Sequence, residues 1–206
     1  HRGYQYPARS YQKWKEVIDI VKYENLEFTY ISIIKKLMET KPLDKISVQE
    51  VTERAELNRQ TFYYHFDDIY DLLKWTLERE AIELLYDRQE ESLWKEGLRD
   101  FLLYLEKNRL FAQNAVYSLG RDQFNRFFHR KVYEIIGNAI QQFAETFCDQ
   151  DEKYLAFLTH YYTISFAATA ISWLQGEIDY SVEEVIQMID RLLQEHIEGA
   201  KVLNYQ

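Results

Sequence analysis

The spacing of apolar residues along the chain predicts helices almost throughout. Between about residues 25 and 39, apolar side chains recur every three or four positions, which places them on one face of a helix. Pro42 is expected to end this helix, because proline cannot donate the N–H that a helix interior requires. The same spacing continues for some twenty residues from Ile69 to Leu85, and returns near the end of the chain from Val182 to Ile197. We therefore expect long amphipathic helices joined by short turns.

Two short helices are predicted between the first two long ones. Ser47 and Glu50 have the spacing of a capping box, in which each side chain satisfies a free backbone N–H of the other. A tight turn at residues 56–57 follows. Asn58 is expected to cap a second short helix that runs to about His65.

Five more helices are expected between about Trp94 and Gln206, among them one from Asp122 to Phe147 and one from about Asp151 to Gln175. A second capping box, Ser181 with Glu184, is expected to open the last of them. Three glycines are expected near helix ends, where left-handed caps occur: Gly120, Gly176 and Gly199. Residues 1–9 are interpreted as an arm, followed by a short amphipathic helix that includes Tyr11 and Trp14.

Composition supports an all-α protein with a buried core. Only 6 glycines and 2 prolines interrupt a chain of 206 residues that is 47% hydrophobic. The single cysteine, Cys148, excludes an internal disulfide and any multi-cysteine zinc site. The most apolar stretch, Ile164 to Leu174, is shorter than the roughly 20 residues that span a bilayer, and no secretory signal is visible. We therefore expect a soluble cytoplasmic protein with no membrane partner.

Two short helices joined by a tight turn and braced by a third form a helix-turn-helix. In that motif the second helix enters a DNA major groove about 12 Å wide, so it must be short and apolar on one side only. The run 58–66 (NRQTFYYHF) meets this demand, because Phe62 and Phe66 can anchor it in the core. Six side chains then remain to face outward: Arg59, Gln60, Thr61, Tyr63, Tyr64 and His65.

The run from Ile46 to Leu73 (ISVQEVTERAELNRQTFYYHFDDIYDLL) resembles the DNA-binding signature of the TetR family of transcription regulators, and the likeness extends from about Leu26 to Leu77. The later runs LEKNRLFAQNAVYS and ISWLQG resemble, more loosely, a Gram-positive branch that includes regulators of dihydroxyacetone-kinase operons. The resemblance implies an all-α subunit of about nine to ten helices. A three-helix DNA-binding domain would precede a larger C-terminal helical bundle, and two subunits would bind a palindromic DNA operator.

By that resemblance, four residues are candidate base readers: Arg59, Gln60, Thr61 and Tyr64. Arginine can pair with guanine, glutamine with adenine, and threonine or tyrosine surfaces can touch a thymine methyl group. Tyr63 and His65 match positions that usually contact the DNA backbone. For Tyr63, contact with a base is the alternative. Ser47 offers a hydroxyl at a helix N-terminus, which favours phosphate. Simpler interpretations are a plain helix cap for Ser47, a solvated charge for Arg59 and core packing for one of the two tyrosines.

The chain is divided by prediction into an arm with a short helix (1–23), a DNA-binding domain (24–75) and an effector-sensing and dimerisation domain (76–206). The helices near 151–175 and 181–199 are the dimerisation candidates, because one carries a run of small residues and the other a clean apolar stripe. The effector is a small molecule or a protein. Aromatic residues of the last domain are candidates for lining an effector pocket, with core packing as the alternative: Phe111, Phe124, Phe128, Tyr161, Tyr162 and Phe166.

Three departures from the family pattern bear on function. Glu56 stands where the turn usually has glycine, and Asp67 and Ile69 stand where lysines usually meet phosphate. Residues 24–75 carry seven Lys or Arg and ten Asp or Glu, a net charge of 7 − 10 = −3. The alternative function is therefore a TetR-like protein that has lost strong DNA binding and acts as a protein-binding partner. No nucleophile–base pair, metal-ligand spacing or phosphate loop points to an enzyme, a cofactor or a metal.

Overall fold

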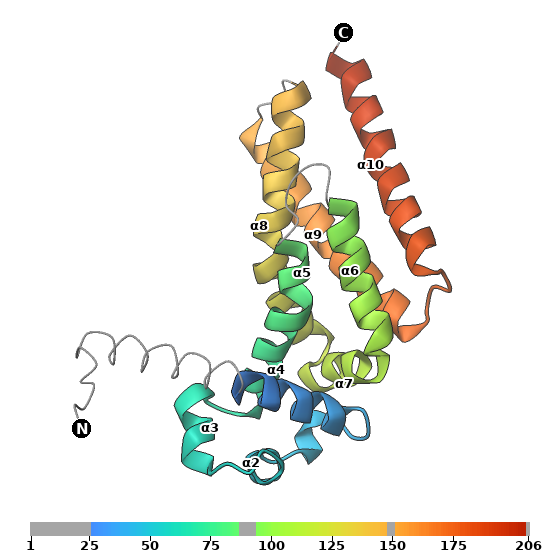
Figure 1. Cartoon of the computed structure of the whole chain (residues 1–206). Coiled ribbons are helices and arrows are strands. Elements are labelled where there is room, and N and C mark those ends of the chain that lie inside the picture. Colours follow the sequence, from blue (N-terminus) through green and yellow to red (C-terminus); the bar gives the residue numbers. More distant parts are fainter. Residues whose placement is uncertain (1–25, 87–93, 148–150, 205–206) are drawn as a thin grey trace, which may run out of the picture.

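Helices are the only regular secondary structure in the part of the chain that the structure describes (Figure 1). The computed structural model describes residues 26–86, 94–147 and 151–204. The first helix covers residues 26–38. The elements that follow are η1 (Leu43–Lys45), α2 (Val48–Arg54), α3 (Arg59–His65), α4 (Ile69–Leu77), η2 (Glu78–Ile82), α5 (Glu83–Tyr86), α6 (Trp94–Lys107), α7 (Arg109–Leu119), α8 (Arg121–Phe147), α9 (Glu152–Gln175) and α10 (Val182–Asn204).

This arrangement confirms the predicted all-α class, with the helix-turn-helix in the N-terminal part and a larger helical bundle after it. The short helix predicted around Tyr11 lies outside the described residues. Within the described ranges, no helix is long and apolar enough to cross a membrane.

The helix 26–38, α2, α3 and α4 meet around one buried cluster, which we call the head cluster. Each helix contributes side chains that are fully buried, because its apolar residues recur on one face. The fully buried members from these helices are Tyr30, Ile34, Met38, Val51, Phe62, Leu72 and Leu73. The helix 26–38, α2 and α3 are thus held against α4 by a shared hydrophobic core.

Helix α7 closes the head cluster from the side of the larger bundle. Phe111, Ala115 and Leu119 of α7 are buried in the cluster. The Ser118 hydroxyl accepts a hydrogen bond from the Leu43 N–H at 3.0 Å, and Asn114 Nδ2 donates to the Met38 carbonyl at 2.5 Å. These bonds satisfy backbone groups that the end of the helix 26–38 and the 3-10 turn leave free.

The helix predicted from Ile69 onward runs to Tyr86, but its middle turn is a π-helix over Glu78–Ile82. Periodicity did not predict this wider turn, which is a feature often found at functional positions. Its side chains contact several elements: Glu80 accepts from Lys35 Nζ at 2.5 Å and from the Tyr104 hydroxyl at 2.7 Å, and Glu78 pairs with Lys131 of α8. Burial, together with the Glu80 carboxylate, raises the pKa of Tyr104, so its hydroxyl remains a donor.

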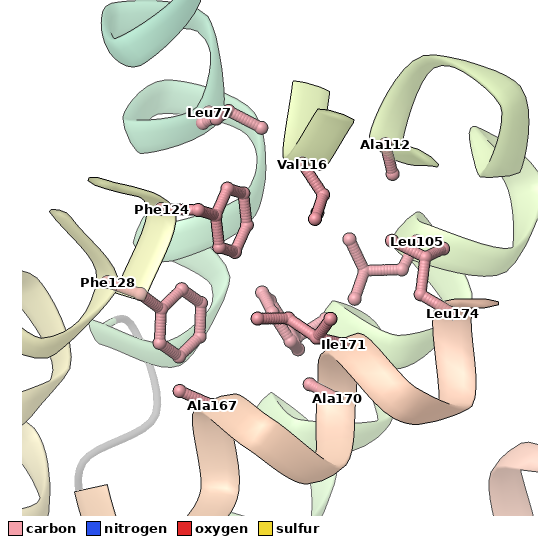
Figure 2. A pocket seen from close by; sticks show the side chains of 11 residues that line it. Leu77, Leu105, Ala112, Val116, Phe124, Phe128, Ala167, Ala170, Ile171 and Leu174 are labelled. Atoms are coloured by element: carbon pink, nitrogen blue, oxygen red, sulfur yellow. The ribbon is translucent and has the colours of Figure 1, made fainter. Parts of the chain in front are cut away.

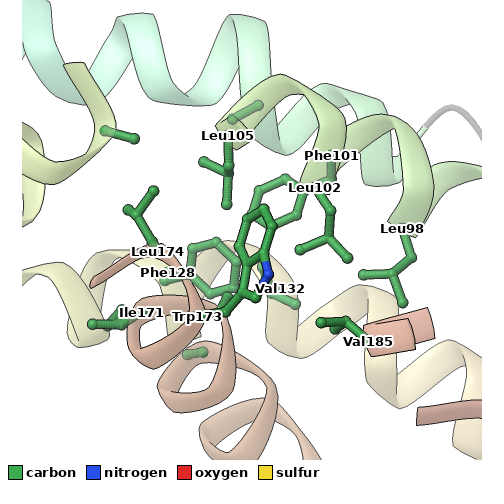
Figure 3. Close-up of a cluster of buried hydrophobic side chains, with 14 of the residues drawn as sticks. Leu98, Phe101, Leu102, Leu105, Phe128, Val132, Ile171, Trp173, Leu174 and Val185 are labelled. Carbon is green, nitrogen blue, oxygen red and sulfur yellow. The ribbon is translucent and has the colours of Figure 1, made fainter. Parts of the chain in front are cut away.

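The larger bundle has its own core, the bundle cluster, built from α6, α8, α9 and α10 with contributions from η2 and α7 (Figure 3). Trp173 is its largest member; its ring is buried and its Nε1 donates to the Tyr180 carbonyl at 2.7 Å. That bond ties the end of α9 to the turn before α10. The capping box that opens α10 is complete, because Ser181 and Glu184 each accept from the other's backbone N–H.

Helices α8 and α9 pack against each other as a pair (Figure 1). Between them, His129 Nε2 lies 3.1 Å from His160 Nδ1, and one ring must donate while the other accepts. Burial and the neighbouring His160 lower the pKa of His129. The His129 ring is therefore harder to protonate than a free histidine.

Two local predictions were wrong in part. Gly199 lies inside α10, which continues to Asn204, whereas Gly176 is a left-handed cap and Gly120 has positive φ with extended ψ. The capping box of α2 keeps the Ser47 cap on the Glu50 N–H at 3.1 Å. The Glu50 carboxylate instead accepts from Lys41 Nζ at 2.7 and 3.0 Å, because this cation offers a stronger, charged donor.

Glu56 adopts the left-handed conformation that its place in the turn demands, with φ of 55°. A side chain in this region costs about 1 to 2 kcal/mol, which exceeds the entropic cost of ordering glycine. We expect Glu56→Gly to raise the free energy of unfolding by about 0.5 to 1 kcal/mol, measured by urea denaturation. The control is Glu134→Gly at an exposed position of α8, which should lower it by about 1 kcal/mol. A loss of stability with Glu56→Gly would contradict this account.

The lowered pKa of His129 makes stability depend on pH. The unfolded chain, with an ordinary histidine pKa of about 6.5, binds a proton that the folded protein resists. This contribution is fully present above that value and is lost as the pH falls toward the lower pKa of the folded state. When the pH is lowered from about 7.5 to about 5, we expect the free energy of unfolding, measured by urea denaturation, to decrease less in His129→Gln than in the wild-type protein. Identical pH dependence in the two proteins would show that the pair is not responsible.

Candidate DNA-binding interface

The backbone of the helix-turn-helix is set by two side-chain caps and one turn. Ser47 caps α2, and Asn58 Oδ1 accepts from the Thr61 N–H at 2.8 Å to cap α3, as predicted. Between them, the Leu57 N–H donates to the Thr52 carbonyl at 2.9 Å. The short connection fixes the angle between α2 and α3.

One side of α3 is held by aromatic packing. The Phe62 ring is fully buried and meets the Tyr30 ring edge-on, with centroids 5.6 Å apart. Phe66 packs against Tyr30 at 5.7 Å and against Trp75 of α4 at 5.4 Å. Such pairs are favourable beyond the area they bury, so they define how α3 is rotated about its axis.

The opposite side of α3 faces solvent. Tyr63 and Tyr64 are 57% and 75% exposed, so neither of them is a core residue. Arg59 and Gln60 are also exposed. Because successive helical residues point about 100° apart, burying Phe62 directs Gln60, Tyr63 and Tyr64 outward. Arg59 lies nearer to the Phe62 side and is exposed at the start of the helix.

Thr61 and His65 are half-buried, and their surroundings limit what they can contact. The Thr61 hydroxyl donates to Asn58 Oδ1 at 3.0 Å, which leaves its methyl group as the free surface. The His65 ring packs between Tyr64 and Phe66, with centroids at 5.2 and 6.1 Å. Ser47 is exposed at the start of α2. All seven predicted residues thus belong to α3 or to the cap of α2, and their roles remain predictions.

One residue beside this surface was not predicted. Arg59 Nη2 donates to Gln49 Oε1 at 2.5 Å, and Gln49 Nε2 donates to Glu53 Oε1 at 2.7 Å. Gln49 lies on α2, ten residues before Arg59. Neither helix periodicity nor capping rules identify such a contact, because it depends on the angle between two helices.

A small apolar cavity lies in the larger bundle, next to the helix that carries the head. Its volume is about 20 Å³. Leu77 of α4 lies at one side of it, with Phe124 and Phe128 of α8 and the small residues Ala167 and Ala170 of α9 around it (Figure 2). The other lining residues are Phe101, Leu105, Ala112, Val116, Ile171 and Leu174.

The structure separates the six aromatic residues that were predicted to line a pocket. Phe124 and Phe128 line the cavity, and Phe166 packs against the Phe128 ring at 5.9 Å. Phe111 is buried in the head cluster. Tyr161 is 55% exposed on α9, and the Tyr162 hydroxyl lies 2.6 Å from Nδ1 of His196 on α10. Sequence spacing alone could not distinguish these environments, because all six occupy helices.

Among the described residues, no three His, Cys, Asp or Glu side chains gather as ligands for a metal ion. Two of the acidic side chains of the helix-turn-helix have partners within that motif or the turn before it. The Glu50 carboxylate pairs with Lys41 and, at 3.5 Å, with Arg54. Glu53 accepts from Gln49.

Comparisons with known proteins agree with this architecture. Residues 32–74 match the family model for bacterial regulatory proteins of the tetR family, and residues 92–195 match that for a transcriptional regulator C-terminal region. The HTH-type dhaKLM operon transcriptional activator DhaS of Lactococcus lactis subsp. lactis is 35% identical over 79 residues. That match covers 38% of this chain and 42% of the relative's length.

Two solved structures share the fold. The dihydroxyacetone kinase operon activator DhaS superposes with a TM-score of 0.65 at 24% identity, covering 84% of this chain and 96% of that one. The TetR family repressor AlkX from a Dietzia species has a TM-score of 0.51 at 14% identity, covering 84% and 95%. The second family model spans half of the chain, and the helix-turn-helix precedes it in the expected place. The chain therefore belongs to the TetR family of transcriptional regulators.

Proposed function

We propose that this regulator binds a palindromic DNA operator as a homodimer, with α3 of each subunit in the major groove, and that an effector acting on the larger bundle controls binding. The observation that carries the proposal is the outer surface of α3, where Arg59, Gln60, Tyr63 and Tyr64 are exposed while Phe62 holds the helix from behind. A dimer is required because two such helices must reach successive major grooves about 34 Å apart.

Roles follow from the chemistry of each side chain. Arg59, the first residue of α3, has the fork of donors that reads guanine, and Gln60 has the paired donor and acceptor that reads adenine. Thr61 offers its methyl group and Tyr64 its ring to a thymine methyl. Tyr63, His65 and Ser47 contact the DNA backbone, which positions α3 without direct sequence information.

The test is selection from a random duplex library by the wild-type protein and by Arg59→Ala. We expect wild type to enrich a palindrome. Arg59→Ala should lose about 1 to 3 kcal/mol on that sequence and relax the preference at one base position in each half-site, because a bidentate contact to guanine is removed.

Two control variants separate charge from base reading. Arg54→Ala removes the same charge from an exposed position of α2, and Ser47→Ala removes the hydroxyl at the start of that helix. Both should leave the base preference unchanged, and Ser47→Ala should weaken all sequences about equally. A wild-type protein that enriches no sequence would favour the alternative, a family member that acts through protein partners.

Dimerisation is proposed to involve the outer face of α9. Phe157, Tyr161 and Ile164 are 61%, 55% and 48% exposed, and their spacing of four and three residues places them on one side of the helix. On α10, Met188 and Leu192 are similarly exposed. Exposed apolar residues in a row indicate a protein contact. Part of the small-residue run faces inward, since Ala167 and Ala170 line the cavity.

We expect the wild-type protein to have about twice the chain mass of 25.0 kDa by light scattering at micromolar concentration. Ile164→Asp should shift it to the monomer, because a buried unpaired carboxylate strongly opposes association. The matched control is Leu110→Asp on α7, where the leucine is 58% exposed, and this variant should remain dimeric. A monomeric wild-type protein would contradict the proposed assembly and the operator geometry with it.

Effector control is proposed to act through the helix run 69–86. Leu77 lines the cavity, while Leu72 and Leu73 on the same helix belong to the head cluster. Small-molecule sites typically measure about 300 to 1,000 Å³. At about 20 Å³ the cavity is far smaller than that, so a small molecule requires its walls to separate, whereas a protein effector needs no cavity. Either effector would change the fraction of dimers in which the two helix-turn-helix motifs are spaced to fit the operator.

A further inference from the structure

Gln49 connects the two helices of the helix-turn-helix through side chains alone. Its Oε1 accepts from Arg59 Nη2 at 2.5 Å, and its Nε2 donates to Glu53 Oε1 at 2.7 Å. Gln49 and Glu53 are one helical turn apart on α2, and Arg59 opens α3. All three side chains are exposed, so the chain of hydrogen bonds lies on the surface of the motif.

The chemistry of the two partners determines how the Gln49 amide is turned. A guanidinium group has only donors, and a carboxylate has only acceptors. The amide oxygen must therefore face Arg59 while the amide nitrogen faces Glu53. Glu53 thus holds the amide in the one orientation that can accept from the arginine.

This contact leaves Arg59 able to read a base. A guanidinium has five N–H donors, and a bidentate contact to guanine O6 and N7 uses two of them. An unrestrained arginine side chain loses considerable rotamer freedom when it is fixed on DNA. A hydrogen bond that orients it beforehand reduces that loss.

We infer that Gln49 is a positioning residue, held by Glu53, that orients Arg59 for base reading. The inference rests on the proposed function, because it assigns Gln49 no role apart from Arg59. It differs from a direct base contact by Gln49, which would give that residue a base position of its own.

The experiment repeats the random duplex selection with Gln49→Ala, Arg59→Ala and the double variant. We expect Gln49→Ala to weaken the preference by about 3- to 10-fold at the same base position that Arg59→Ala affects, as fits the net contribution of one typical hydrogen bond. In the Arg59→Ala background, Gln49→Ala should change the preference no further. Gln187→Ala, at an exposed position of α10, is the matched control and should leave the preference unchanged.

A swapped pair provides the rescue. In the double variant Gln49→Glu with Glu53→Gln, the carboxylate at position 49 accepts from Arg59, and the amide at position 53 donates to that carboxylate. The hydrogen bonds and the net charge are both retained. This variant should recover the wild-type preference. Because the substituted residues are exposed, thermal unfolding should stay at the wild-type temperature in each variant.

Two results would overturn the inference while leaving the proposed function intact. One is a wild-type preference in Gln49→Ala. The other is a loss at a different base position that persists without Arg59, which would make Gln49 a direct reader. A wild-type protein that selects no sequence would instead overturn the proposed function and this inference together.

Discussion

The helix run from Ile69 to Tyr86 contributes side chains to both hydrophobic cores, and this sharing constrains how the described parts of the chain can move. Leu72 and Leu73 are buried in the head cluster, and Ala81 and Ile82, two to three turns later, are buried in the bundle cluster. Close-packed side chains do not deform gradually, so a shift of the helix at one end must repack the other. A change in the bundle therefore has a direct mechanical route to the helix-turn-helix.

Helix α3 illustrates how strongly a functional surface depends on the core behind it. A helix of seven residues is too short to be stable alone, since nucleation costs more than so few hydrogen bonds return. Asn58 satisfies a free N–H at its start, and Phe62 and Phe66 bury its inner side against Tyr30 and Trp75. The exposed side chains are consequently presented by packing that lies behind them, and the Tyr63 ring contacts it edge-on through Phe62, with centroids 5.5 Å apart.

The polar contacts between the first helix, the π-turn and α6 determine how these elements are oriented more than they stabilise the fold. Lys35, Glu80 and Tyr104 join the head, the π-turn and α6, and all three are only partly exposed. For partly buried charges, the cost of leaving water offsets much of the attraction, while the loss of one partner leaves an uncompensated charge. The π-turn allows Glu78 and Glu80 to contact α8 and the first helix from neighbouring positions.

Much of this protein could be predicted from local sequence, because local rules govern helices. Apolar spacing gave the helices, and Ser47, Asn58, Ser181 and Gly176 cap them through interactions within a few residues. The outward side of α3 also followed, since burying Phe62 determines where its neighbours point. The head's charge balance and the turn at Glu56 are likewise local properties.

Contacts between distant residues were decided only by the tertiary structure. Phe111 and Phe128 are both aromatic residues on helices, yet one is buried in the head cluster and the other lines the cavity. Glu50, the expected capping-box partner of Ser47, instead accepts a hydrogen bond from Lys41. Arg59 donates a hydrogen bond to Gln49 on the preceding helix. The physical reason is that helix spacing determines which face of each helix is apolar, whereas the angles at which helices pack determine which faces meet.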